Sequence, residues 1–126
     1  MGGDYERTLD LYEEASRQYF SQALRDGSYY GLLLKVGGRI AAGGGVVISA
    51  WPGSPLNFEA RRAWILNVYV EPEFRRQGLA LAIMQCLIEW CRGNGFQSVA
   101  LHSREYGRSR YEKLGFQPTN EMRLRF

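Results

Sequence analysis

Histidine is almost absent from this chain of 126 residues, and cysteine is scarce. The single histidine, His102, and the two cysteines, Cys86 and Cys91, are too few for a metal cluster built from such ligands. No pattern indicates a cation site made of carboxylates alone, so we predict no metal. The cysteines are five residues apart on a predicted helix. They therefore point roughly 140° apart, which prevents a disulfide between them, and we predict that both are buried thiols.

The sequence also lacks a long apolar run, an internal repeat and a low-complexity segment. No stretch reaches the length that a membrane helix needs, and the first ten residues, MGGDYERTLD, lack the apolar centre of a signal peptide. These absences predict a cytoplasmic protein without membrane contact. The length suits one domain, which we place over residues 1–126.

Positive charge is in small excess, and it is unevenly placed. The formal net charge is +3; residues 64–126 hold nine basic and six acidic groups, whereas residues 1–63 hold seven of each. Most of the basic residues are arginines, whose planar guanidinium binds phosphate well. On charge alone, a solvated basic face is the better explanation. An excess this small argues against nucleic acid as the partner.

The first half of the chain predicts a helix followed by a hairpin. Apolar residues recur at helical spacing over residues 7–25. The next stretch, YYGLLLKVGGRIAAGGGVVIS, predicts two antiparallel strands joined at Gly37 and Gly38. The glycine run 43–45 inside the second strand predicts a bulge, or a place where another element packs against bare backbone.

The second half predicts a parallel unit. Residues 63–70, AWILNVYV, are apolar on both faces, as in a central strand. The following helix has one apolar stripe, consisting of Leu79, Ile83, Cys86, Leu87 and Trp90. A further strand over residues 98–103 completes a right-handed βαβ crossover. With a short helix at SRYEKL and a closing strand near EMRLRF, the predicted fold is α/β, a mixed central sheet with helices on both faces.

One loop, between the central strand and the helix, points to a ligand. In VEPEFRRQGLA two arginines precede Gly78, which comes where the helical pattern begins. A helix N-terminus carries unpaired N–H groups and a partial positive charge, so it suits anions. A glycine there lets an anion approach the backbone without meeting a side chain. The loop therefore predicts a phosphate-bearing ligand.

Three motifs in this order resemble the GCN5-related N-acetyltransferase family. The loop Arg75-x-x-Gly78-x-Ala80 is similar to that family's pyrophosphate-binding signature, ILNVYVEPEFRRQGLA to its strand and loop, and RYEKLGF to its C-terminal motif. The resemblance covers about residues 28–126 and leaves the family's first strand and first helix unmatched. A sheet without that strand would expose an edge for a partner chain, so we expect a homodimer.

The resemblance implies acetyl-CoA as the cosubstrate, held by two groups of residues. The first group binds the pyrophosphate through backbone N–H groups and arginine charge: Arg75, Arg76, Gln77, Gly78, Leu79 and Ala80. In the family the pantetheine arm lies between two parallel strands that separate, and it pairs with the first of them like an added strand. The second group would provide this main-chain pairing and consists of Val68, Tyr69 and Val70.

Tyr111 is the catalytic residue that the RYEKLGF motif implies. In the family this tyrosine lies beside the thioester sulfur and can protonate the departing thiolate. A phenol titrates at about 10 and a thiol at about 8.5, so proton transfer from a tyrosine to a thiolate is not downhill. Hydrogen bonding to the sulfur therefore fits these values at least as well as full proton transfer. The implied mechanism is direct attack of an amine on the thioester, without a covalent enzyme intermediate.

The general base departs from the family's pattern. Relatives often carry a carboxylate on the strand before the loop, where this chain has Leu66 and Asn67. Asn67 could orient a water or the acceptor amine, and Glu71 and Glu121 are the alternative carboxylates. Arg104 stands where many relatives have asparagine.

Two functions remain open from the sequence. The first is an N-acetyltransferase that moves an acetyl group from acetyl-CoA to a primary amine of a small molecule or peptide. The second is a coenzyme A-binding module without turnover, which the missing carboxylate and the unmatched N-terminal elements favour. A basic nucleic-acid-binding domain is a third and weaker alternative.

Overall fold

The computed structural model of the chain describes residues 17–53, 55, 60–103, 107–119 and 121–126. Residues 17–26 are helical, as the periodicity predicts, and the earlier part of the predicted helix lies outside the described residues. Gly27 follows this helix with a φ of 78°, which glycine adopts without strain. The Ser28 N–H then donates to the Ala23 carbonyl at 3.0 Å, closing the turn into the first strand.

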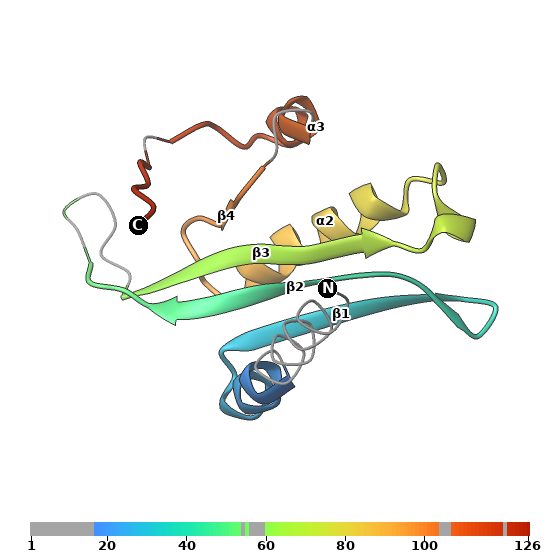
Figure 1. Cartoon of the computed structure of the whole chain (residues 1–126), viewed down its shortest axis with the longest axis horizontal. Coiled ribbons are helices and arrows are strands. Elements are labelled where there is room, and N and C mark those ends of the chain that lie inside the picture. The colour runs from blue at the N-terminus through green and yellow to red at the C-terminus, as the bar shows by residue number, and fades with distance from the viewer. Residues whose placement is uncertain (1–16, 54, 56–59, 104–106, 120) are drawn as a thin grey trace, which may run out of the picture.

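Four strands form one mixed sheet in the order β1-β2-β3-β4 (Figure 1). They are β1 (Tyr29–Val36), β2 (Arg39–Ala50), β3 (Arg61–Val70) and β4 (Ala100–Leu101). The predicted hairpin is confirmed, since β1 and β2 are antiparallel and meet at two glycines with φ of 58° and 80°. The parallel unit is confirmed as well, because β3 pairs antiparallel with β2 and parallel with β4.

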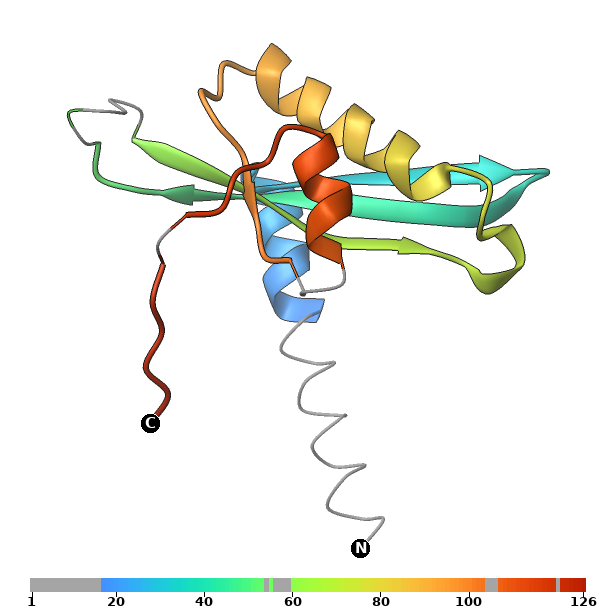
Figure 2. The same cartoon turned by 90° about the horizontal axis from the view of Figure 1, so that it is seen from above.

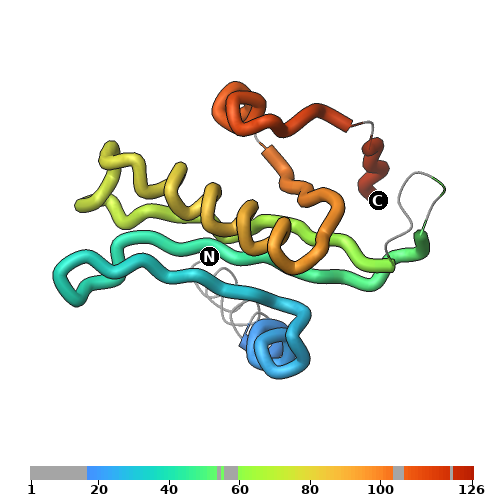
Figure 3. Tube along the Cα trace, turned by 180° about the vertical axis from the view of Figure 1, so that it is seen from behind, coloured from blue at the N-terminus to red at the C-terminus, as the bar shows by residue number. Residues whose placement is uncertain are grey.

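Helices lie on both faces of this sheet, as predicted. Helix α2 (Leu79–Gly93) covers one face, and residues 17–26 lie against the other (Figure 2). Seen from behind, α2 runs along β2 and β3 (Figure 3). Ile83, Leu87 and Val46 are fully buried between them. Burying each such side chain contributes about 1.5–3 kcal/mol, so the core fixes where the N-terminus of α2 lies.

A bulge in β3 lies opposite the glycine run of β2. Between the paired positions on either side, Asn67 and Val68 together face the single residue Gly44. The extra residue therefore belongs to β3, where Asn67 has a φ of 59°, a left-handed conformation that asparagine tolerates. The glycines of β2 serve the other predicted purpose, which is close packing against bare backbone.

Gly44 is where that packing is tightest. A Cβ built on Gly44 would lie 3.0 Å from Ile83 and 3.1 Å from both Leu87 and Val68. We expect Gly44→Ala to lower the free energy of unfolding by about 1–3 kcal/mol, because an added methyl overpacks a closed core. Urea denaturation followed by circular dichroism measures this change. Gly93→Ala is the matched control, since a Cβ there has open space around it. Equal stability of the Gly44→Ala protein and the parent would contradict the tight contact.

Two strands near the C-terminus differ from the prediction. The strand expected over residues 98–103 is reduced to the two residues of β4, and residues 121–126 form no strand. The alternation of Met122, Leu124 and Phe126 suggested a half-buried strand, but these side chains are 93%, 78% and 115% exposed. Alternation defines two faces without supplying a neighbouring strand or a covering layer, and neither is present among the described residues. The predicted short helix is confirmed as α3 (Arg108–Lys113).

The prediction that both cysteines are buried is wrong for Cys86. Cys91 is buried, whereas Cys86 is exposed. The buried residues of α2 are Ile83, Met84, Leu87 and Cys91. At 100° per residue, the centre of this buried face lies roughly 110° around the helix from Cys86. The buried face is therefore rotated away from Cys86, compared with the apolar stripe that the sequence predicts.

Candidate active site

Strands β3 and β4, at the β4 end of the described sheet, stay paired over only part of the length of β3. They pair only at Trp64 with Ala100 and at Ile65 with Leu101. β3 then continues to Val70, paired with β2 on its other side. Over residues 66–70 the edge of β3 that faces β4 thus has no strand partner within the described chain. Such an edge offers main-chain donors and acceptors to an extended ligand.

The end of this open edge is closed by an arginine side chain. Arg75 Nε donates a hydrogen bond to the Val70 carbonyl at 3.2 Å. The guanidinium is therefore held beside the last residue of β3, between the open strand edge and the start of α2. Arg76 adopts a φ of 65°. This left-handed residue turns the chain between the short helix η1 (Pro72–Phe74) and α2.

The N-terminus of α2 lacks any side-chain cap. Its N-cap residue is Gly78, with a φ of 77°, and its first turn contains no acidic residue. A Cβ added to Gly78 would meet nothing within 4 Å, so the surface in front of the helix end is open. The N–H groups of the first turn have no intrahelical partner. This end of α2 can therefore accept an anion against bare backbone, as the sequence predicts.

The nearby carboxylate of Glu73 is not free to take the place of an anionic ligand at the N-terminus of α2. Glu73 pairs with Arg39 of β2 at 2.8 Å, and the Arg39 guanidinium holds the pKa of that carboxyl below its usual value. The ring of Phe74 lies 5.8 Å from the same guanidinium. Glu73 is thus drawn toward β2, and the arginines of the loop keep their positive charge for a ligand.

Tyr111 comes from α3, on the far side of the gap between the strands. Its half-buried ring packs edge-on against Phe116, with centroids 6.1 Å apart. An ion pair between Arg108 and Glu112, at 3.0 Å, links consecutive turns of this short helix beside Tyr111. The contact with Phe116 therefore restrains the position of the Tyr111 ring.

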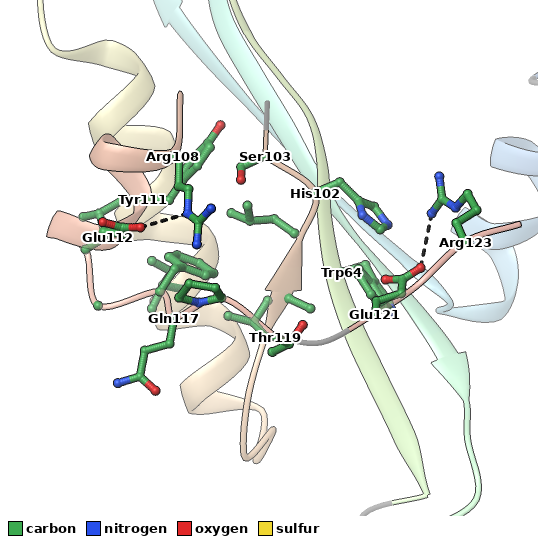
Figure 4. A pocket seen from close by; sticks show the side chains of 18 of the residues that line it. Trp64, His102, Ser103, Arg108, Tyr111, Glu112, Gln117, Thr119, Glu121 and Arg123 are labelled. Atoms are coloured by element: carbon green, nitrogen blue, oxygen red, sulfur yellow. Dashed lines mark hydrogen bonds and ion pairs between the residues drawn. The ribbon is translucent and has the colours of Figure 1, made fainter. Parts of the chain in front are cut away.

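A cavity of about 1070 Å³, here called the charged cavity, brings Tyr111 and Glu121 together. The two line opposite sides, with Tyr111 and Arg108 on one side of β4 and Glu121 on the other (Figure 4). Glu121 is paired with Arg123 at 3.2 Å and is exposed. Asn67 does not line this cavity. It opens into a second pocket of about 440 Å³, formed by the sheet and residues 17–26.

The structure adds residues that the sequence did not single out. His102, directly after β4, lines the charged cavity and stacks on Trp64, with ring centroids 4.9 Å apart. A neutral imidazole has a ring nitrogen that can accept a proton, so His102 is a candidate base. From the sequence it counted only against a metal cluster. The signal that could have identified His102 as a site residue is its position at the carboxyl end of a predicted strand, beside the gap between β3 and β4.

Other chemistries find less support in the described residues. Burial raises the pKa of the Cys91 thiol, so it is not activated as a nucleophile. No group of three or more histidine, cysteine, aspartate or glutamate residues in the described part could hold a metal ion. Within the same part, no helix is both long and apolar enough to cross a membrane.

The parted strands, the uncapped helix N-terminus and Tyr111 of α3 are the features that the resemblance to the acetyltransferase family leads us to expect. The comparison with family models agrees, because residues 3–116 match the acetyltransferase (GNAT) family. The chain belongs to this family, and the resemblance seen in its motifs is confirmed. A search of the curated proteins found no match.

Solved structures share the fold. A GCN5-related N-acetyltransferase from Ralstonia eutropha JMP134 is 32% identical, with a TM-score of 0.85 over 94% of this chain and 78% of that chain. A predicted acetyltransferase with acetyl-CoA from Clostridium acetobutylicum is 26% identical, with a TM-score of 0.78 over 86% and 71% of the two chains. Glucosamine-6-phosphate N-acetyltransferase from Arabidopsis thaliana is 22% identical, with a TM-score of 0.70 over 90% and 77%.

Proposed function

We propose that this protein transfers an acetyl group from acetyl-CoA to a primary amine. The observation that carries the proposal is the open edge of β3 over residues 66–70, ending beside the uncapped N-terminus of α2. A pantetheine arm needs main-chain partners along its length, and a pyrophosphate needs N–H groups at one end. Both requirements are met along one continuous stretch of chain. The related structure from Clostridium acetobutylicum, described as having acetyl-CoA, supports the same ligand.

The residues that would hold the coenzyme follow from this geometry. The main chain of Val68, Tyr69 and Val70 would pair with the pantetheine arm. The backbone N–H groups of residues 77–80 would hold the pyrophosphate, because the helix end is uncapped and the surface before Gly78 is open. Arg75 and Arg76 would add positive charge there.

Acetyl-CoA supplies an activated thioester, and the protein's own groups orient the acceptor and stabilise the leaving sulfur. Tyr111 would direct its hydroxyl to that sulfur, since its ring is held in place by Phe116. A hydrogen bond to a developing thiolate lowers the barrier because it strengthens as charge builds. Asn67 would orient the acceptor amine through its amide oxygen.

The group that accepts the proton of the attacking amine differs from the family's pattern. No carboxylate lines the pocket into which Asn67 opens among the described residues, and Glu121 is paired with Arg123. This observation favours a second candidate function, a coenzyme A-binding module without turnover. In an active enzyme, His102, Glu112 or Glu121 in the charged cavity could accept a proton through water.

Calorimetry and a thiol-release assay test the proposed function together. We expect acetyl-CoA to bind with one molecule per chain, and thiol release to depend on both the protein and an added primary amine. A double-stranded oligonucleotide of the same phosphate concentration is the control for non-specific binding to the basic loop. Failure of acetyl-CoA to bind would refute the proposal. Binding without thiol release over a broad amine panel would favour the non-catalytic module instead.

A further inference from the structure

The pocket of about 440 Å³ lies on the sheet face opposite α2, and we call it the sheet-face pocket. Its volume is within the usual range for small-molecule sites. Strands β1, β2 and β3 form its floor, and residues 17–26 form one wall. The residues that line it are Phe20, Leu24, Tyr29, Gly31, Leu32, Leu33, Gly44, Asn67 and Tyr69. No lining residue in the described chain carries a charge.

The floor of the sheet-face pocket is aromatic because β2 has no side chains there. A Cβ on Gly43 would lie 3.0 Å from the ring of Tyr69, and a Cβ on Gly45 would collide with the phenol of Tyr29. The missing side chains therefore let both rings lie close to the sheet. Phe20 packs edge-on against Tyr29, with centroids 4.8 Å apart. The result is an apolar surface that suits a flat ring.

Asn67 is the polar group of the sheet-face pocket apart from the tyrosine hydroxyls. The bulge places it there, at the point where β3 leaves β4 and its open edge begins. If the acetylated arm lies along that edge, the polar end of the pocket adjoins the thioester. An amine bound in the pocket would then have its nitrogen at Asn67 and the rest of the molecule over the tyrosine rings.

We propose that the acceptor is a primary amine carried on an uncharged, ring-bearing apolar body, bound in the sheet-face pocket. This inference rests on the proposed function and names its substrate class. The neutral amine nitrogen attacks the thioester carbonyl, so that the C–N bond forms and the C–S bond breaks. The nitrogen loses one proton to water, and the thiolate leaves with a hydrogen bond from Tyr111.

The absence of charge favours this class for a physical reason. No lining carboxylate in the described chain would stabilise an ammonium there, so the neutral amine, which is the nucleophile, is disfavoured less than it would be beside a negative charge. Polycationic or phosphorylated acceptors would be better held by the charged cavity, which contains Arg108, Glu112, Glu121, Arg123 and Arg125. The two cavities therefore predict opposite orders of preference among amines.

An amine panel measures this order by thiol release. We expect kcat/KM for 2-phenylethylamine to exceed that for ethanolamine by roughly ten- to a hundredfold, the range that burying a phenyl group supplies. Spermidine and glucosamine 6-phosphate should fall with ethanolamine or below it. If ethanolamine, spermidine or the sugar phosphate is the best acceptor, the proposed class is wrong while the acetyltransferase function stands.

A charge introduced into the pocket tests the site itself. Leu33 is 58% exposed on β1, so Leu33→Glu should fold, and we expect it to lower kcat/KM for 2-phenylethylamine at least about tenfold. Ile40→Glu is the matched control, because Ile40 is also an exposed strand residue, at 44%, and lines neither cavity. The acetyl-CoA dissociation constant should not change in either variant. Equal effects of the two substitutions on 2-phenylethylamine would overturn the assignment of the pocket.

Two further measurements test whether the sheet-face pocket binds such an amine if no amine releases thiol. Saturation-transfer NMR should detect 2-phenylethylamine on the acetyl-CoA-bound parent protein and not on Leu33→Glu, and absence of binding to the parent would overturn the proposal. Light scattering tests whether a second copy of the chain covers this face. A dimer that Leu33→Glu dissociates and Ile40→Glu does not would assign the surface to self-association and would also overturn it.

Discussion

Replacing Tyr111 by phenylalanine is expected to lower kcat about ten- to a thousandfold, the range that spans one lost hydrogen bond to developing charge and a lost general acid. The ring remains, so its edge-on packing against Phe116 is kept and the fold should be unchanged. The acetyl-CoA dissociation constant should stay within about threefold, because the lost interaction strengthens only as the sulfur gains charge. Steady-state kinetics with the best acceptor and calorimetry with acetyl-CoA measure the two quantities.

Tyr30→Phe provides the matched control for this substitution. Tyr30 stacks on Trp90 with ring centroids 4.2 Å apart and lines neither of the two cavities, so it should keep full activity without its hydroxyl. Full activity of the Tyr111→Phe enzyme would make Tyr111 a packing residue. Weaker acetyl-CoA binding with an unchanged kcat would make it a residue that positions the coenzyme.

The second large effect is expected from Gly78→Glu, which should abolish measurable binding of acetyl-CoA. The carboxylate would enter the open surface in front of α2, repel the pyrophosphate and compete for the same N–H groups. Each charge-assisted hydrogen bond is worth about 1.5–3 kcal/mol, so losing two corresponds to at least about a hundredfold in the dissociation constant. Calorimetry with acetyl-CoA measures the loss.

Gly27→Glu separates this effect from backbone strain. Gly27 has a φ of 78°, against 77° for Gly78, and a Cβ at either position would lie in open space. The two variants therefore carry the same new charge and a similar strain, about 1–2 kcal/mol. Urea denaturation should show similar losses of stability, while only Gly78→Glu should lose the coenzyme. Unchanged affinity of the Gly78→Glu protein would refute the assignment of the loop.

Most elements of the fold could be predicted because they depend on local pattern. Two apolar runs joined by two glycines predicted the β1–β2 hairpin, and one apolar stripe at helical spacing predicted α2. The predictions failed where a strand depends on a neighbour. Residues 121–126 alternate correctly, yet they have no strand partner in the described chain. The exposure of Cys86 was missed for a related reason, since the sheet's contact with α2 sets the rotation of the helix.

The candidate site also has parts that local sequence could predict and parts that it could not. The loop before α2, where we propose that the pyrophosphate binds, could be predicted because Arg75, Arg76 and Gly78 directly precede the first turn of the helix. The two cavities could not, because each assembles side chains from distant elements. Tyr111 and Glu121 line opposite sides of one cavity, on either side of β4, and Asn67 lines the other pocket with Tyr29 and Phe20.

The sequence by itself determined the family, the order of most elements and the position of the loop that carries Arg75, Arg76 and Gly78, because short motifs and periodicities encode them locally. Only the tertiary structure decided that β3 carries the bulge, that Asn67 and Tyr111 line different cavities, and that one cavity is charged while the other is not. The physical reason lies in Asn67, whose positive φ shifts the alternation of β3. A shift of one residue exchanges the two faces of a strand, and packing against β2 and α2, more than any local pattern, determines where it occurs.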